Sequence, residues 1–170
     1  MEDSSKSPPK PASDYESGIN DDDRIDLRIW LRLLTCTNLI ERQVRQKLRT
    51  EFDTTLPRFD ILAQIDRSPE GQPMRELSRR LMVTNGNITP LVDRLIEDGL
   101  VVREQSQNDR RVQHVRLTTA GKDALDNMIP QHKNWVSALM RNMERSQAIA
   151  LYELLGRLKD SILNSDNRKF

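Results

Sequence analysis

The sequence predicts a mainly α-helical protein with one small β-hairpin, arranged as a winged helix-turn-helix between longer helices. Two short apolar stripes with the spacing of helices follow one another within residues 74–97. Two valine-rich segments, 101–106 and 112–117, then flank a turn-forming stretch, which is typical of a hairpin with a long loop. Longer amphipathic stretches precede and follow this unit. Because their apolar stripes are too long for one small domain to cover, we expect them to form a dimerisation region.

The composition limits the kinds of function that are plausible. A length of 170 residues predicts one domain, and a net charge of +1 restricts any nucleic-acid site to a local patch. The charge is unevenly spread, because residues 1–23 hold seven acidic groups against two lysines and residues 75–122 hold nine basic groups against six acidic ones. The single cysteine cannot form an intramolecular disulfide. No apolar run suits a membrane span or a signal peptide, so we expect a cytoplasmic protein without membrane contact.

The first long helix is expected within residues 23–53. Residues 1–22 before it are rich in Ser, Pro and Asp, and we expect a disordered leader, either merely solvated or acting as an acidic arm that competes with DNA. Asp23 is the expected N-cap, and the helix should reach about Glu51 over a length of roughly 42 Å. One face of this helix is apolar. The opposite face is basic, as a solvated surface or a site for an anionic ligand group would be. Its basic residues are Arg42, Arg45, Lys47 and Arg49.

The next lobe is expected to span residues 54–117. Thr54-Thr55-Leu56-Pro57 is a helix-start signal, and this helix should end near Ser68. A short helix with Met74, Leu77 and Leu81 follows. We expect Asn85-Gly86-Asn87 to break the helical pattern as a turn. The second stripe then makes a helix that ends just before Gly99, a residue suited to a left-handed cap. Its apolar residues are Ile88, Leu91, Val92, Leu95 and Ile96.

Residues 118–165 should return to the dimerisation region. Thr118 is expected to start a helix that continues toward Met143, and Pro130 should kink or interrupt it. Ser146 can cap a last helix. That helix is apolar on more than one side, which again predicts burial in a dimer.

The polar residues around the second short helix point to duplex DNA. Asparagine pairs with adenine edges, threonine offers a hydroxyl and a methyl group, and arginine binds phosphate or enters a narrow minor groove. Asp109 is expected to orient a neighbouring arginine rather than to touch DNA. The candidate DNA-binding residues are Arg79, Arg80, Thr84, Asn85, Asn87, Thr89, Arg94, Asp109, Arg110 and Arg111.

Three segments together resemble the MarR family of bacterial transcription regulators: Leu95–Val101, Asp109-Arg110-Arg111, and Val115–Thr118 with Gly121. The resemblance runs from about Arg24 to the C-terminus. It implies a homodimer in which the first and last two helices interlock. It also implies binding to a palindromic operator, usually as a repressor, and release by a small ligand held between the dimer region and the DNA-binding lobe.

The stretch Asn127–Trp135 resembles a subgroup of the family that controls aromatic-acid catabolism, although Pro130 and Lys133 depart from its motif. This resemblance implies an inducer such as a hydroxycinnamic acid or its coenzyme A thioester. His132 and Trp135 would meet the aromatic ring, unless Trp135 is simply dimer core, and the basic face of the first helix would meet the phosphates of the thioester. The candidate ligand residues are Trp30, Thr37, Arg42, Arg45, Arg58, Phe59, His132 and Trp135.

Other chemistry is weakly supported by the sequence. Some members of the family sense peroxide through a cysteine on the first helix, but we expect Cys36 to be a buried structural thiol because no second cysteine can resolve a sulfenate. His114 and His132 lack the spacing of metal ligands, and no nucleophile–base pair or glycine-rich phosphate loop is present. We therefore expect neither an enzyme nor a cofactor. The alternatives to a ligand-responsive regulator are a redox regulator acting through Cys36 and a winged-helix module that binds protein.

Overall fold

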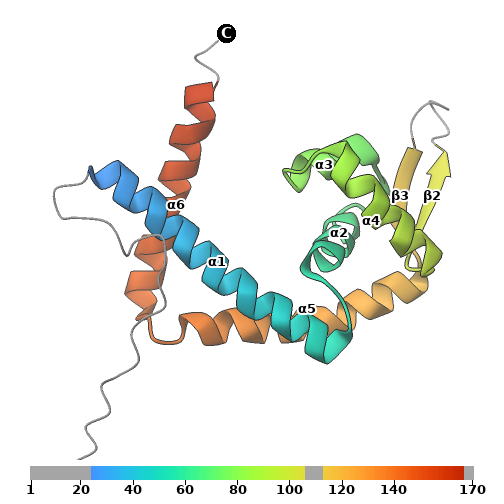
Figure 1. Ribbon diagram of the computed structural model, residues 1–170, viewed down its shortest axis with the longest axis horizontal. Coiled ribbons are helices and arrows are strands. Elements are labelled where there is room, and N and C mark those ends of the chain that lie inside the picture. Colours follow the sequence, from blue (N-terminus) through green and yellow to red (C-terminus); the bar gives the residue numbers. More distant parts are fainter. Residues whose placement is uncertain (1–23, 106–112, 167–170) are drawn as a thin grey trace, which may run out of the picture.

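The computed structural model describes residues 24–105 and 113–166, and it is mostly helical with one small antiparallel sheet (Figure 1). This confirms the predicted fold class. In chain order the elements are α1 (Ile25–Phe52), α2 (Leu56–Asp66), β1 (Gln72–Pro73), α3 (Met74–Arg80), α4 (Asn85–Glu97), β2 (Val101–Gln105), β3 (Gln113–Leu117), α5 (Thr119–Met140) and α6 (Arg145–Asp166).

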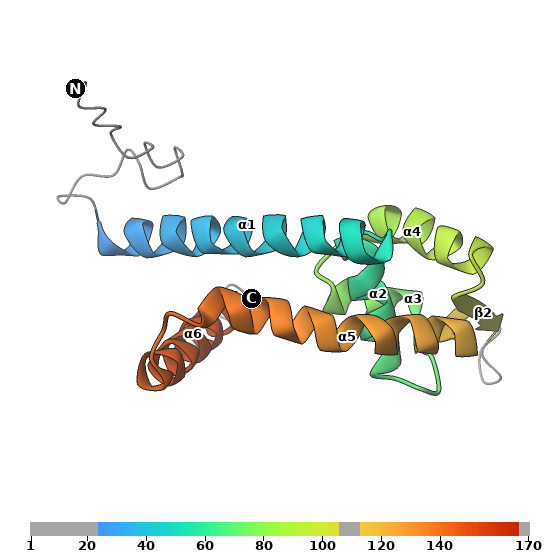
Figure 2. The same cartoon turned by 90° about the horizontal axis from the view of Figure 1, so that it is seen from below.

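The described chain has two parts, a compact lobe from α2 to β3 and a set of long helical arms. Figure 2 shows α1 running alongside α5, and both helices extend from the lobe in the same direction. At the far end of α5 the chain turns into α6, which crosses the first half of α1 (Figure 1). The lobe is therefore carried at one end of the arms.

The sheet has the strand order β1-β3-β2. β2 and β3 form the predicted hairpin, with Val101 opposite Leu117 and Gln105 opposite Gln113. The sequence did not predict β1, which pairs Gln72 with Val115. Two residues are too short to show the alternation by which a strand is recognised.

The apolar core lies within the lobe and extends to the adjoining ends of α1 and α5. The predicted stripe of α4 is buried or half-buried along its whole length, and Leu95 is 0% exposed. From outside the lobe, Leu48 of α1 and Leu125 of α5 join the same cluster. The arms and the lobe are thus joined by one continuous core.

A close contact fixes the start of α5 against the base of the hairpin. The Thr118 hydroxyl donates to the Gly99 carbonyl at 2.7 Å and accepts from the Gly121 N–H at 3.0 Å, as a helix cap. The Thr118 N–H also donates to the Leu100 carbonyl at 3.1 Å. A Cβ atom on Gly121 would lie 1.9 Å from the Leu100 oxygen, so no larger residue fits this junction. Gly99 adopts φ +71, as its expected role as a left-handed cap requires.

The turn between α3 and α4 was assigned wrongly from the sequence. Asn85-Gly86-Asn87 is the first turn of α4 rather than a break, and the turn comes earlier, before Thr84. Thr84 is extended, and its carbonyl accepts from the Asn87 and Ile88 N–H groups at 3.0 and 3.2 Å. Asn and Gly suit a helix start as well as a turn, so composition alone does not distinguish the two.

Three other expected boundaries also differ. Helix α5 continues through Pro130, since the turns around it pack through buried Met128 and Trp135, and it ends at Met140. Helix α6 begins one residue before Ser146, and the Gln147 side chain accepts from the Glu144 N–H at 3.0 Å, in place of the expected serine cap. Arg24 precedes α1 without a side-chain cap, and Asp23 lies outside the described residues. Within the described ranges, no helix has the length and apolar character needed to span a membrane.

Candidate nucleic-acid interface

The first turn of α4 presents polar groups on a firmly held helix. Thr84, Gly86 and Asn87 are exposed, Thr89 is half-buried, and Asn85 is the first helical residue. The next turns of α4 are anchored by the buried stripe that begins at Ile88. A rigid helix with small, exposed polar residues at its N-terminus can approach base edges and phosphates closely. Arg94 is exposed as well, but it lies in the last turn of α4, at the other end of the helix.

Two arginines of α3 share one carboxylate. Arg79 Nη2 lies 2.7 Å from Glu76 Oε1, and Arg80 Nε lies 2.6 Å from the same oxygen. The two guanidinium groups lower the pKa of Glu76 to about 2, chiefly by hydrogen bonding, so this carboxylate is ionised at neutral pH. The pair stays exposed beside the helix-turn-helix, where it can exchange Glu76 for a phosphate.

One ion pair holds the hairpin against α4 and another joins its two strands, and neither was predicted from the sequence. Arg103 of β2 lies 2.7 Å from Asp93 of α4, and Arg116 of β3 pairs with Glu104 across the hairpin. The predicted tip residues Asp109, Arg110 and Arg111 lie outside the described residues. Their assignment to the minor groove therefore stays a prediction.

An aromatic cluster joins α1, α2 and α5 at the root of the lobe. The Phe59 and His132 rings lie 4.7 Å apart between centroids, and Trp135 lies 6.5 Å from His132. Phe52 and the Lys47 ammonium also contact the Trp135 ring, at 6.0 and 5.5 Å from its centroid. Trp135 is only 7% exposed within a single subunit, so it belongs to the subunit core rather than to dimer core alone. Burial lowers the pKa of His132, which favours the neutral imidazole.

Two cavities lie near the end of α1, and each is lined by an arginine from the predicted ligand set, but Phe59, His132 and Trp135 line neither of them. A cavity of about 580 Å³ is lined by Arg58, Asn127 and Gln131, among others, and Arg58 pairs with Asp98 at its side. A second cavity of about 390 Å³ is lined by Arg45 and other residues of α1 and of the start of α2. Both cavities lie where α1 meets the lobe.

The remaining charges of the predicted basic face are partly neutralised. Arg45 pairs with Glu41 at 2.6 Å and Lys47 with Glu51 at 3.4 Å, while Arg42 is exposed on the same helix. These are ordinary pairs one helical turn apart, and each stabilises an exposed helix only slightly. The basic face is therefore less positive than its arginine and lysine content indicates.

The first half of α1 does not reach the aromatic cluster within one subunit. Trp30 lies fifteen residues before Arg45, about 22 Å along the helix. Trp30 is 58% exposed and Thr37 is exposed, so the structure does not bring them together with His132. Cys36 is also exposed, and the expectation of a buried thiol is wrong for the single subunit. Trp30, Thr37 and Cys36 are exposed for the same reason: this part of α1 projects beyond the lobe.

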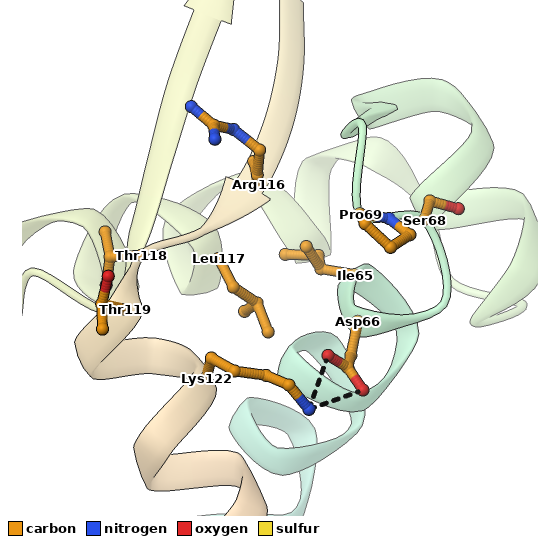
Figure 3. A pocket seen from close by; sticks show the side chains of 9 residues that line it. All are labelled: Ile65, Asp66, Ser68, Pro69, Arg116, Leu117, Thr118, Thr119 and Lys122. Atoms are coloured by element: carbon orange, nitrogen blue, oxygen red, sulfur yellow. Dashed lines mark hydrogen bonds and ion pairs between the residues drawn. The ribbon is translucent and has the colours of Figure 1, made fainter.

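A third cavity, of about 360 Å³, lies between the end of α2, β3 and the start of α5 (Figure 3). Lys122 points across it to Asp66 at 3.2 Å and also pairs with Asp126 at 2.6 Å, so its charge is compensated. None of the predicted site residues lines this cavity. Because Lys122 is paired with Asp66 and Asp126, the charged side chains of this cavity do not indicate a ligand-binding site.

Comparison with known proteins shows which family has this architecture. The family model described as "MarR family" matches residues 54–112, which cover α2, the helix-turn-helix and β2 and end before β3. A solved structure of a MarR family transcriptional regulator from Silicibacter pomeroyi is 30% identical, with a TM-score of 0.72, over 85% of this chain and 99% of that one. The chain belongs to the MarR family.

Other relatives agree with this assignment. An uncharacterised helix-turn-helix-type transcriptional regulator of Bacillus cereus is 34% identical over 136 residues, which are 79% of this chain and 88% of that protein. The structure of Streptococcus pneumoniae FabT in complex with DNA shares the fold at 24% identity, with a TM-score of 0.69 over 82% of this chain and 98% of that one. As a MarR-type protein, the chain is a helix-turn-helix transcriptional regulator and not an enzyme.

Proposed function

We propose that this MarR-type regulator is a homodimeric repressor that binds a palindromic operator and is released by a small anionic aromatic ligand. The observation that carries the DNA-binding part is the exposed polar first turn of α4 on a helix anchored by Ile88, Val92 and Leu95. Each subunit would place this turn in the major groove, with half-sites about one helical turn of DNA apart. Arg79 and Arg80 would hold phosphates, and Arg110 or Arg111 would enter the flanking minor groove.

The exposed apolar surface of the arms supports a dimer. Large hydrophobic side chains of α1 and α6 remain open to solvent in the single chain, including Ile29 and Leu154. Ile29 and Leu154 line one groove between the two helices, and an exposed apolar surface of this kind is typical of a protein–protein interface. Because most homodimers are related by a twofold axis, such a pair would match a palindromic operator.

Repression is supported by the name of one of two further relatives, YetL, whereas the name of the other, MhqR, says only that it is a regulator. Bacillus subtilis YetL, a helix-turn-helix-type transcriptional repressor, is 37% identical over 83 residues, about half of each protein. Bacillus subtilis MhqR, a helix-turn-helix-type regulator, is 26% identical over 87 residues, which are 51% of this chain and 60% of that protein. For this chain, repression would follow from operator occupancy by the dimer.

The ligand part rests on the aromatic cluster and on the two cavities near the end of α1. Phe59 and neutral His132 offer an apolar face and a hydrogen-bonding ring, and Arg58 and Arg45 each line one of the two cavities. A phenolic acid needs such partners for its ring and carboxylate, and a coenzyme A thioester would also need cations for its phosphates. The inducer of a catabolic operon would therefore be an aromatic acid or its thioester. Its binding must favour the DNA-free state by several kcal/mol to invert operator occupancy.

The test combines DNA binding with ligand titration. The full-length protein should shift the DNA beside its own gene, and Arg110→Ala or Arg111→Ala should weaken this binding by about 1–3 kcal/mol each without unfolding the dimer. Aromatic acids and their thioesters should bind in isothermal titration and release the DNA. Absence of binding by either ligand class would reject the proposed inducer. Failure to bind any duplex at low salt would reject the DNA-binding function itself.

A redox response is the second candidate, because Cys36 is exposed. Under this alternative, peroxide would release the wild-type protein from DNA and would leave Cys36→Ser bound. Under our proposal, the two proteins respond alike to peroxide and to the ligand.

A further inference from the structure

The turn of the helix-turn-helix holds a methionine in a conformation that methionine rarely adopts. Met82 has φ +54, in the left-handed region where a side chain is strained. Hydrogen bonds fix this geometry on both sides, from the Met82 N–H to the Arg79 carbonyl at 3.2 Å and from the Val83 N–H to the Ser78 carbonyl at 3.1 Å. Glycine would adopt the same turn without strain. Strain of this kind is often found where a side chain has a functional task.

The Met82 side chain is not packed in the protein core. It is 93% exposed, the highest value among the exposed large hydrophobic residues in the described part of the chain. Within the described residues of the lobe, only Met82 and its neighbour Val83 are exposed large hydrophobics. All the others belong to the arms. Those residues are Ile25, Leu27, Ile29, Trp30, Leu39, Met140, Ile149, Leu151, Tyr152, Leu154, Leu155, Ile162 and Leu163.

The distance in the fold between Met82 and the apolar residues of the arms indicates which partner would contact Met82. A second copy of the chain would use the apolar surface of the arms, which does not include the turn. Met82 and Val83 instead continue directly into the exposed Thr84 and the first turn of α4, the surface assigned to DNA. In the major groove, the apolar group that a base presents is the 5-methyl group of thymine. A flexible thioether side chain adapts well to such a contact.

We propose that Met82 is a specificity-determining residue that contacts the 5-methyl group of a thymine in each operator half-site. This inference rests on the proposed DNA-binding function and adds the base that the turn would select. The strained turn presents an apolar group beside the polar residues of α4. The polar residues would then read hydrogen-bonding edges, while Met82 would read a methyl group.

The test removes the proposed contact first from the DNA and then from the protein. A duplex is first selected by the wild-type protein from a random pool, and each thymine is then replaced in turn by deoxyuridine, which lacks only the methyl group. Wild-type affinity should fall about fourfold per half-site at one symmetric position, the factor expected for one buried methyl group. Met82→Ala should bind the thymine duplex more weakly by a similar factor or more, and should not respond to deoxyuridine at that position.

Two further variants separate binding from folding. Met82→Leu keeps an apolar side chain and should retain the response to deoxyuridine. Met82→Gly should lose that response while its melting temperature rises by roughly 2–4 °C, because glycine relieves the strained φ. This combination would show that the methionine serves DNA recognition at the expense of stability.

Three results would overturn the inference. The first is a wild-type protein with no position sensitive to deoxyuridine, and the second is a Met82→Ala variant with the same sensitivity as wild type at every position. Equal weakening of Met82→Ala on selected and random duplexes would instead assign the residue to the sugar–phosphate backbone. If the wild-type protein selects no duplex at all, the proposed DNA-binding function fails together with this inference, whereas the first three results reject only the role of Met82.

Discussion

The lobe and the helical arms of this protein use their apolar residues in opposite ways. In the lobe, the stripe of α4 and its partners on α2 and β3 form a buried core. In the arms, α1 and α6 leave large hydrophobic side chains exposed in the single chain, and Leu154 is 61% exposed. The lobe therefore buries its apolar residues within one chain, whereas the arms leave an apolar surface that the proposed dimer would cover. Under the proposed function, dimerisation and DNA recognition would use different surfaces of the same chain.

The largest expected effect tests whether the lobe is self-sufficient. Leu95→Ala should lower the free energy of unfolding by about 2–5 kcal/mol, because it leaves a cavity in a fully buried site. Urea denaturation checks this value, and the exposed neighbour Arg94→Ala is the matched control, with an expected change within about 0.5 kcal/mol. Equal changes in both variants would mean that α4 is not anchored as described.

The next prediction tests whether the arms are incomplete. Leu154→Asp should leave the lobe folded but convert the dimer to single chains at micromolar concentration, because a carboxylate would be buried in an apolar interface. Analytical ultracentrifugation measures the mass, and Glu153→Gln in the same helix is the control. A dimer that persists in Leu154→Asp would place the interface elsewhere.

A third prediction concerns the polar surface of the lobe. Asn87→Ala should reduce discrimination between operator variants by about 1–3 kcal/mol while leaving non-specific affinity nearly unchanged, if its amide contacts a base. Competition between selected and random duplexes measures the difference. An equal loss on both would show that Asn87 contacts only the backbone.

Removing the charge of Glu76, the carboxylate shared by two arginines of α3, should have a smaller effect on DNA binding and in the opposite direction. Because Glu76 occupies Arg79 and Arg80 and its pKa is about 2, it competes with phosphate at every physiological pH. Glu76→Gln should therefore bind DNA more tightly at low salt, with a salt dependence steeper by about one phosphate contact. Weaker DNA binding by this variant would show that Glu76 positions the arginines.

The smallest expected effect concerns His132, which lies where the arms meet the lobe. The folded-state pKa of His132 is lowered by burial, so the unfolded chain takes up its proton first as pH falls. This contribution to stability is present above the ordinary histidine pKa, near 6.5, and is lost progressively below it. His132→Phe should keep the stacking on Phe59 and flatten the stability profile in this range. An unchanged profile would assign the dependence to other groups.

The contrast between the two regions also explains what the sequence could predict. The stripe from Ile88 to Ile96 was predicted correctly, because a helix buried on one face within its own subunit has a clear 3.6-residue period. The exposure of Cys36 was missed, because it depends on how far α1 projects beyond the lobe. The strand Gln72–Pro73 is defined only by its pairing with β3, which no local pattern reveals.

The candidate site was predictable to a similar extent. Arg79 and Arg80 follow from their place beside the helix-turn-helix, and their pairing with Glu76 follows the spacing of a helical turn. The contact between Phe59 and His132 joins residues 73 positions apart, so only the resemblance to a family could suggest it. The left-handed conformation of Met82 had no sequence signal, because methionine is not a residue typical of that region.

The most direct test of the account is the mass and salt dependence of the complex between the full-length protein and a selected duplex. Sedimentation should show two chains on one duplex, and the affinity should fall about a thousandfold or more between 50 and 200 mM salt through counterion release. One chain per duplex, or no binding at 50 mM salt, would contradict the division of the molecule into a dimerising pair of arms and a DNA-reading lobe.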